Sequence, residues 1–190
     1  MIRSKRYKCL GTNLYKLEDY SIVSIQKSDM EPIRRWRNEQ ISVLRQNSLL
    51  TEKEQEEYYR NVIKPSFTQE KPSQILFTYL LSGQVIGYGG LTNIDWVSKK
   101  AEVSFLLGTN RTKDRKLYRK EFSLFLDLIK QVAFQDMDFH LLFTETYDIR
   151  PLHIEILEEN KFKLEDRFKK HVVVNEKYFD LLIHVLINSN

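Results

Sequence analysis

Residues 84–120, QVIGYGGLTNIDWVSKKAEVSFLLGTNRTKDRKLYRK, decide the fold that this sequence predicts. The stretch contains two strand-like runs joined by a polar turn, then a cluster of positive charge, then the beginning of an apolar helix. Glycine inside a strand marks a bulge, or a place where another chain segment or a ligand lies close to the backbone. Five of the chain's six glycines lie in this stretch or directly against it, namely Gly83, Gly87, Gly89, Gly90 and Gly108.

The sequence on either side extends these runs into a larger sheet. Residues 75–81, 85–94 and 101–108 are apolar runs with short connections, which is typical of an antiparallel meander. Short strands are expected within residues 6–26. Later strands are expected at residues 140–147, 168–174 and 180–187, the last two as a hairpin.

Helix signals separate these strands. Ser28 with Glu31 and Thr51 with Glu54 have the spacing of a capping box. Residues 121–134 carry an apolar face at helical spacing, and Pro151 suits the first turn of a further helix. The order of elements predicts a mixed α/β (α+β) single domain over residues 1–190, with a mostly antiparallel central sheet flanked by helices.

Composition narrows the class of protein. Hydrophobic residues make up 42% of the 190 residues, which is enough for a core. The net charge of +4 allows an anionic ligand, but the basic residues are spread along the chain, so nucleic acid is not the expected partner. The apolar runs are too short for a membrane span and the N-terminus lacks a secretory signal, so we expect a cytoplasmic protein. The one cysteine and the spacing of the four histidines predict no metal site.

The densest charge follows residues 101–108. Six cations within ten residues are opposed by Asp114 alone: Arg111, Lys113, Arg115, Lys116, Arg119 and Lys120. A helix N-terminus already carries positive partial charge, so cations there indicate either a bound anion or a solvated basic turn.

Polar side chains elsewhere could carry chemistry. Glu102 alternates with apolar neighbours and could accept a proton from an attacking amine, or lie exposed and pair with Lys99 or Lys100. Arg37, Asn38 and Arg45 could contact a polar substrate or form a wet helix face. Tyr147, at a strand end, could donate a proton or simply pack.

The chain resembles the GNAT acyltransferases, in the branch of the ribosomal-protein and amino-sugar N-acetyltransferases. The resemblance covers about residues 20–187. Several local phrases carry it: Arg35-Trp36-Arg37-Asn38, Ile86-Gly87, Ile94-Asp95, Ala101-Glu102-Val103 and residues 156–162, ILEENKF.

This resemblance implies a sheet whose strands at residues 101–108 and 140–147 splay apart, with acetyl-CoA in the gap. The pantetheine arm would bind the backbone of Phe105, Leu106 and Leu107, and one N–H of that strand would stabilise the oxyanion. The diphosphate would lie on the loop from Arg111 through Lys113, Asp114 and Arg115 to Lys116. The acceptor, an amino sugar, small amine or protein N-terminus, would meet Arg37, Asn38, Arg45 and Tyr147. Glu102 would remove its proton, and a homodimer is one expected assembly.

The chain also departs from the family pattern. Both glycines of the diphosphate loop are missing, and a side-chain grip by Lys113, Arg115 and Lys116 would have to replace them. The tyrosine that protonates the leaving thiolate in many members falls at Leu157. His153, one turn earlier, is either a substitute acid or a helix-capping or core residue. The alternative function is a degenerate GNAT fold without catalysis that binds a ligand or another protein.

Overall fold

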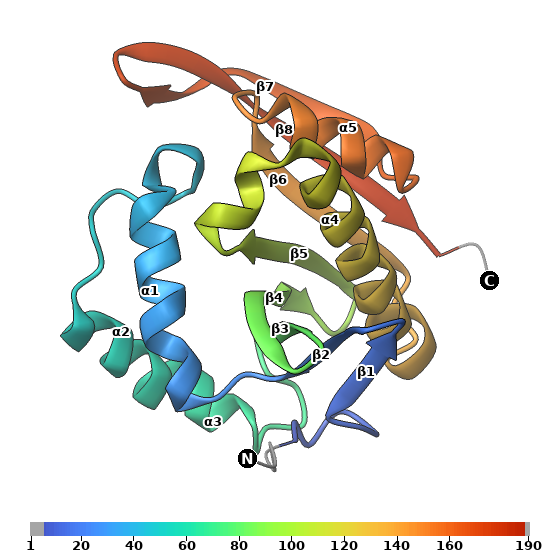
Figure 1. Ribbon diagram of the computed structural model, residues 1–190. Coiled ribbons are helices and arrows are strands. Elements are labelled where there is room, and N and C mark those ends of the chain that lie inside the picture. Colours follow the sequence, from blue (N-terminus) through green and yellow to red (C-terminus); the bar gives the residue numbers. More distant parts are fainter. Residues whose placement is uncertain (1–5, 189–190) are drawn as a thin grey trace.

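The computed structural model describes residues 6–188, which form one eight-stranded sheet with helices on both sides (Figure 1). The strand order is β1-β2-β3-β4-β5-β6-β8-β7, and all neighbours are antiparallel except β5 and β6. The bounds are β1 Leu14–Leu17, β2 Tyr20–Ser24, β3 Ile75–Leu81, β4 Gln84–Asp95, β5 Lys100–Leu107, β6 Leu141–Tyr147, β7 Lys163–Val174 and β8 Lys177–Ile187. The predicted fold class, with its central and mostly antiparallel sheet, is confirmed.

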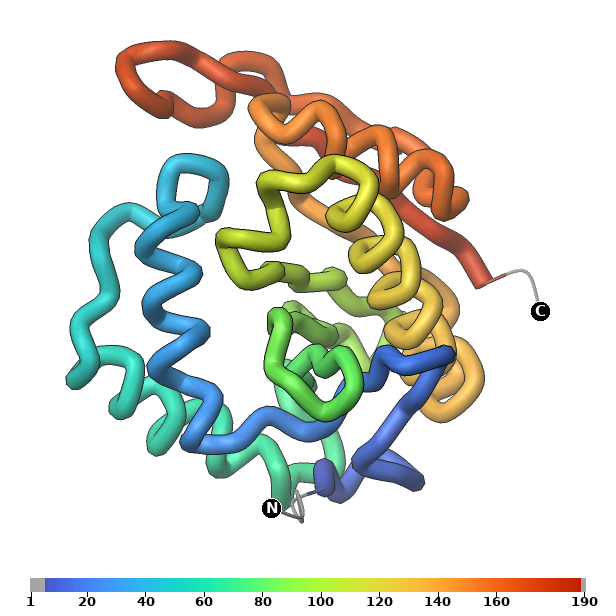
Figure 2. Tube along the Cα trace, in the orientation of Figure 1, coloured from blue at the N-terminus to red at the C-terminus, as the bar shows by residue number. Residues whose placement is uncertain are grey.

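The helices form two groups. One group lies on the far side of the sheet from the other, as the trace in Figure 2 shows. The first consists of α1 (Met30–Glu39), α2 (Glu52–Tyr58) and α3 (Lys64–Ser66), and the second of α4 (Arg115–Lys130) and α5 (Pro151–Glu159). Short helical turns extend them: η1 Lys27–Asp29, η2 Ile41–Val43, η3 Tyr59–Ile63, η4 Thr109–Lys113 and η5 Gln131–Asp136. The capping box at Thr51 and the first-turn position of Pro151 are confirmed.

Two helix starts differ from the sequence prediction. Helix α4 begins at Arg115 rather than at Glu121, because the Asp114 side chain accepts hydrogen bonds from the backbone N–H groups of Lys116 (2.9 Å) and Leu117 (3.1 Å). The capping box at Ser28 is wrong, because the buried Asp29 accepts instead from the backbone N–H of Gln26 at 2.9 Å, ahead of η1. Four of the six clustered cations, from Arg115 to Lys120, therefore lie in α4.

The sheet splits between β5 and β6. The two strands pair only at Lys100–Leu141, Ala101–Leu142 and Glu102–Phe143. From residue 103 onward β5 pairs with β4 alone, so its other edge is free of strand partners. Because alternate N–H and C=O groups of a strand face each edge, this opening exposes backbone donors and acceptors. The predicted splay is confirmed.

Close contacts fix β4 and β5 against their neighbours. Gly90 has φ of +149°, and a Cβ there would lie 2.1 Å from the carbonyl oxygen of Ile75, so the segment that approaches it is the neighbouring strand β3. Phe105 stacks on Phe122 of α4 with ring centroids 4.4 Å apart. On the other side, Gln40 at the end of α1 donates from Nε2 to the carbonyl oxygen of Leu107 at 2.9 Å.

Candidate active site

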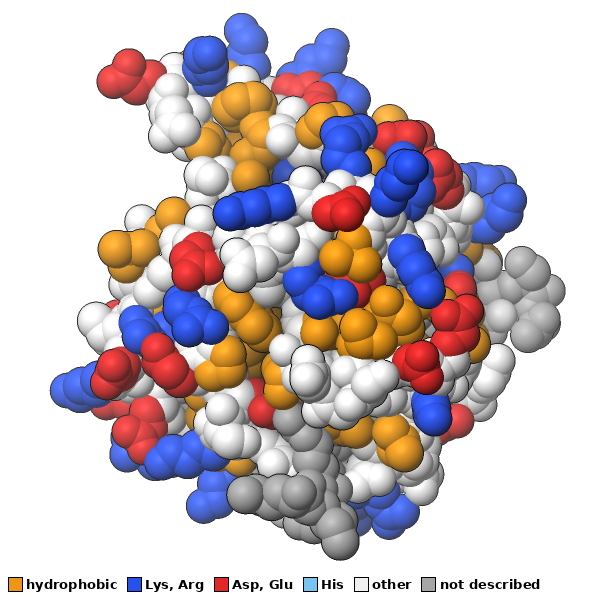
Figure 3. Space-filling model, viewed as in Figure 1, with side chains coloured by type: hydrophobic (Ala, Val, Ile, Leu, Met, Phe, Trp, Pro, Cys, Tyr) orange, Lys and Arg blue, Asp and Glu red, His pale blue; other side chains and the backbone are white. Residues whose placement is uncertain are grey.

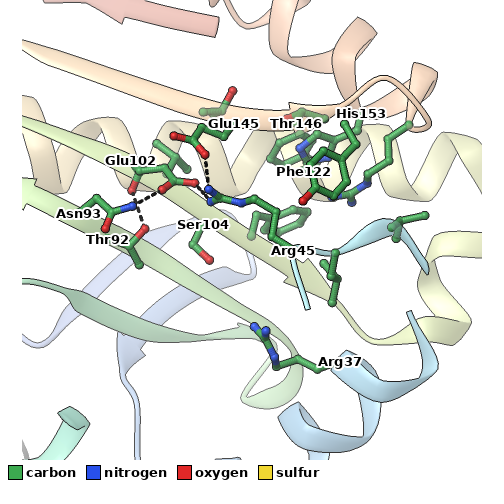
Figure 4. Close-up of a pocket in the computed structure, with 17 residues that line it drawn as sticks. Arg37, Arg45, Thr92, Asn93, Glu102, Ser104, Phe122, Glu145, Thr146 and His153 are labelled. Carbon is green, nitrogen blue, oxygen red and sulfur yellow. Dashed lines mark hydrogen bonds and ion pairs between the residues drawn. The ribbon is translucent and has the colours of Figure 1, made fainter. Parts of the chain in front are cut away.

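The opening between β5 and β6 contains a cavity of about 370 Å³. Both strands line it: Glu102 and Ser104 come from β5 and Glu145 from β6, as Figure 4 shows, and Tyr147 of β6 also belongs to the lining. Loop residues after η2, among them Arg45, close one side of the cavity. The splay therefore brings polar side chains from three separate parts of the chain around one space.

Glu102 lies at the head of this opening, at the last residue pair that joins β5 and β6. It is only 2% exposed, so the alternative of an exposed glutamate paired with Lys99 or Lys100 is wrong. Arg45 binds Glu102 and Glu145 together, as Figure 4 shows. The second oxygen of Glu102, Oε2, accepts from Nδ2 of Asn93 at 2.6 Å. A carboxylate that borders the cavity is thus buried and fixed in position.

Asn93 reaches Glu102 because β4 is irregular there. The register between β4 and β5 shifts between Thr92 and Asp95, and Asn93 has φ of +47°. Asparagine tolerates this left-handed conformation better than most residues do. The sequence analysis did not single out Asn93. Its position directly before the phrase Ile94-Asp95 is the only signal that could have identified it.

The surroundings of Glu102 set its protonation. Burial raises the pKa of Glu102 above its ordinary value, and Glu145 adds to the rise, while the Arg45 guanidinium and Asn93 act in the opposite direction. A raised carboxyl pKa lies closer to neutral pH, where a general base works best. The residue is therefore suited to accept a proton.

His153, the predicted substitute acid, lines the same cavity in a buried aromatic stack. Its ring lies 4.2 Å from that of Phe122 at 14°, and its Nδ1 is 2.8 Å from the hydroxyl of Tyr118. Arg150 donates to the same hydroxyl at 2.9 Å. Burial lowers the pKa of His153 well below its ordinary value, and the Arg150 cation contributes, so the ring is neutral at neutral pH. Tyr118 and Arg150 are site residues that the sequence analysis missed.

A further cavity of about 450 Å³ lies next to the basic turn. It shares Val43, Arg150 and His153 with the first cavity and extends to Thr109, Thr112 and Arg115. Of the four cations predicted to hold the diphosphate, Arg115 lines this cavity, and Lys113 at the end of η4 and Lys116 in the first turn of α4 lie exposed beside it in the chain. The free edge of β5 ends next to this cavity. Backbone groups that can hydrogen-bond to amides and cationic side chains therefore lie close together. That combination fits a long, phosphorylated ligand that contains amide groups, as acetyl-CoA is.

Two predicted cofactor residues have partners within the protein. Arg111 donates from Nε to the fully buried Glu121 at 2.7 Å and binds it again through a second nitrogen. The Asp114 carboxylate accepts from the N–H group of Lys116, which the resemblance assigned to the diphosphate, and from that of Leu117. Contacts of the loop with a cofactor stay predictions, and the structure gives Arg111 and Asp114 internal partners.

The predicted acceptor residues on α1 have different surroundings. Asn38 holds the following loop: Oδ1 accepts from the Leu50 backbone N–H at 2.8 Å, and Nδ2 donates to the Leu50 carbonyl oxygen at 2.9 Å. Arg37 lines the first cavity together with a second one of about 320 Å³ beneath α1 and α2. The structure thus brings Arg37, Arg45 and Tyr147 to one cavity, whereas Asn38 positions the loop that carries Arg45.

Comparison with known proteins identifies the class. The profile of the acetyltransferase (GNAT) domain matches residues 22–183. No curated protein matches the chain. A split sheet with a buried glutamate at its head is thus accompanied by a sequence match over most of the chain. The class that this match defines is an acetyltransferase.

The family follows directly: this chain belongs to the GNAT acetyltransferases. Among solved structures, it is similar to the spermidine N-acetyltransferase from Vibrio cholerae in complex with CoA and spermine, with TM-score 0.77 and 17% identity, covering 91% of this chain and 98% of that one. It is also similar to the ribosomal-protein-S5-alanine acetyltransferase from Vibrio fischeri, with TM-score 0.71 and 16% identity, covering 93% and 97%. At such identities the structural likeness establishes the fold. The comparisons do not support the alternative of a degenerate fold without catalysis.

Proposed function

We propose that residues 1–190 act as one acyltransferase domain that moves the acetyl group of acetyl-CoA to a primary amine, with Glu102 as the general base. One observation carries this: Glu102 is buried at the point where β5 and β6 separate, and it borders the cavity between them. An ammonium group that enters the cavity can transfer its proton to Glu102, directly or through water.

Acetyl-CoA would lie along the free edge of β5. Its pantetheine amides would bind the backbone of Phe105, Leu106 and Leu107, and its phosphates would be held by side chains rather than by a glycine loop. The cations available for this are Lys113, Arg115, Lys116 and Arg150. The CoA complex of the Vibrio cholerae neighbour supports the same co-substrate.

The transfer step needs three groups. The deprotonated amine attacks the thioester carbonyl, and a β5 N–H at the free edge stabilises the oxyanion that forms. Collapse of the tetrahedral species breaks the C–S bond, the nitrogen of the new amide loses its second proton to water, and the leaving thiolate takes up a proton. We assign that last proton to the Tyr118–His153 pair, because burial raises the pKa of Tyr118, so that its hydroxyl keeps its proton, and this hydroxyl lies 2.8 Å from Nδ1 of His153.

The remaining predictions concern partners and location. On the face shown in Figure 3, Lys and Arg alternate with Asp and Glu, which favours a small-molecule or peptide amine acceptor over nucleic acid. No helix among residues 6–188 is long and apolar enough to cross a membrane. A cytoplasmic location, a homodimer and a mechanism without metal stay predictions.

The test is thiol release from acetyl-CoA in the presence of a panel of primary amines, together with thermal unfolding in the presence of CoA. A ligand at about a hundred times its Kd adds roughly 2.7 kcal/mol to the free energy of unfolding. We expect a CoA-dependent rise in Tm and amine-dependent thiol release. If millimolar CoA causes no rise in Tm and no amine causes thiol release, the proposal is contradicted.

A further inference from the structure

Arg37 lies where two cavities meet. The cavity between β5 and β6 and the cavity beneath α1 and α2 share Arg37, Thr92 and Ser104 in their walls. Thr92 is the register partner of Glu102 on β4. A molecule that fills the second cavity and extends past Arg37 would therefore bring its end to the proposed base.

The charge of Arg37 has no carboxylate partner within residues 6–188. Its Nε donates to Oε1 of Gln46 at 2.9 Å, and one terminal nitrogen donates to the Tyr88 hydroxyl at 2.8 Å. Both of these partners are neutral. The side chain is half-buried, and a cation in such a place is stabilised by an anion. Arg37 is thus a candidate partner for an anionic group of the ligand.

The walls of the second cavity are largely apolar. Eight of its residues form this surface: Ile25, Met30, Ile33, Leu50, Tyr58, Ile63, Leu76 and Tyr88. Its carboxylate, Glu54, is the partner of a helix cap, since Oε2 accepts from both the backbone N–H and the hydroxyl of Thr51 at 2.8 Å. The cavity therefore suits an apolar group, and the single carboxylate in its lining is held by the helix cap.

The first cavity does not favour a polycation either. Its arginines, Arg37, Arg45 and Arg150, outnumber its two carboxylates, Glu102 and Glu145. Both carboxylates bind Arg45. A single ammonium could displace Arg45 from Glu102, but further positive charges on the same molecule would meet arginine.

We infer that the acceptor is a small monoamine that carries an anionic group for Arg37 and an apolar body for the cavity beneath α1 and α2. This rests on the proposed function, because it takes the amine to Glu102. It separates this chain from the Vibrio cholerae neighbour, whose complex contains the polyamine spermine.

The experiment uses matched pairs of amines that differ in a carboxylate. We would compare phenylalanine with phenethylamine, leucine with isoamylamine, and 6-aminohexanoate with pentylamine, with spermidine as the polycation. Binding to the full chain is measured by calorimetry, with and without CoA. A charge-assisted contact predicts that the carboxylated member of at least one pair binds roughly ten- to a hundredfold more tightly than its partner and than spermidine.

Substitutions at two positions of α1 test whether Arg37 causes the preference for the carboxylated amine. Arg37→Met should remove it, and Arg37→Lys should restore part of it. Arg35→Met is the matched control, because Arg35 is exposed two residues away and its nearest carboxylate, Glu39, is 3.9 Å distant. It should retain the full preference.

Failure of this inference can be told apart from failure of the transferase proposal. If spermidine or the plain amines bind as tightly as the acids, or if Arg37→Met keeps the preference, the inference is overturned even where amines are acetylated. If the acids bind through Arg37 but no amine causes thiol release, the binding preference assigned to Arg37 stands and the proposed reaction fails.

Discussion

Two buried glutamates in this protein bind an arginine, and they differ in what else they touch. Glu102 and Glu121 are 2% and 0% exposed, and each holds a partly exposed guanidinium, that of Arg45 and that of Arg111. Glu121 lies under aromatic cover, with the Tyr20 hydroxyl 3.4 Å from its Oε1. Glu102 lies beside the cavity between β5 and β6.

This difference separates a structural ion pair from a candidate catalytic one. Both pairs combine a desolvated carboxylate with a cation, so burial and charge alone do not distinguish them. The Glu102 pair borders the cavity between β5 and β6, and its arginine also binds a second carboxylate, Glu145. Access for a substrate, rather than the ion pair itself, marks the site.

The largest expected effect is that of Glu102→Gln on turnover. Loss of a general base reduces kcat by about 10²- to 10⁴-fold. The amide is nearly isosteric, so CoA should raise the Tm of the variant as it does for the wild type. Steady-state thiol release and thermal unfolding measure both properties. Unchanged turnover would show that Glu102 is not the general base. The Glu102–Arg45 pair would then be structural, as the Glu121–Arg111 pair is.

Glu121→Gln should lower the stability of the protein and leave turnover unchanged. It leaves the Arg111 guanidinium without its buried carboxylate, which costs about 1–3 kcal/mol in the free energy of unfolding. Turnover by the folded fraction should be retained, because Glu121 does not line the cavity between β5 and β6. Chemical denaturation gives the first quantity and initial rates below the Tm give the second. A loss of kcat without a loss of stability would show that the Glu121–Arg111 pair, like the Glu102–Arg45 pair, serves catalysis.

Arg45→Gln should move the pH profile. Glu102 must be ionised to accept a proton, so kcat/KM rises with pH through its raised pKa. Without the Arg45 cation that pKa rises further, which shifts the profile to higher pH and lowers the rate at neutral pH several-fold. The folded-state pKa exceeds the unfolded one, so the contribution of Glu102 to stability is present at low pH and lost as pH rises through the folded pKa.

Rates measured across a pH series on the wild type and Arg45→Gln test this. Arg35→Gln serves as the exposed control and should leave the profile in place. A shift of the Arg45→Gln profile to lower pH would contradict the assigned electrostatics.

The smallest effect concerns the turn beside Arg111. Asp114→Gly should cost only a few tenths of a kcal/mol, since glycine is a tolerated N-cap. It removes a negative charge and frees the N–H groups of Lys116 and Leu117, so CoA should bind more tightly. Calorimetry with CoA measures this, and Asp114→Asn separates the charge from the cap. Weaker CoA binding by Asp114→Gly would indicate that Asp114 itself assists the co-substrate.

Local patterns were a good guide to the fold and a partial guide to the site. Alternation within β5 identified Glu102, and a first-turn proline located α5. The start of α4 was missed because the cations around Asp114 were read as a turn, although the aspartate caps the helix. Asn93 had no signal other than its place before Ile94-Asp95, since its contact with Glu102 depends on an irregularity in β4. Tyr118 had none, since it depends on packing between α4 and α5.

The sequence by itself determined the elements, their order and the family, because periodicity, turn residues and local phrases act over a few neighbouring positions. Only the tertiary structure decided which charges face a cavity and which face each other. Arg37, Arg45 and Arg111 are similar in sequence, yet they contact neutral groups, two glutamates and one buried glutamate respectively. The reason is distance along the chain: Glu102 and Arg45 are 57 residues apart, and only the fold brings them together.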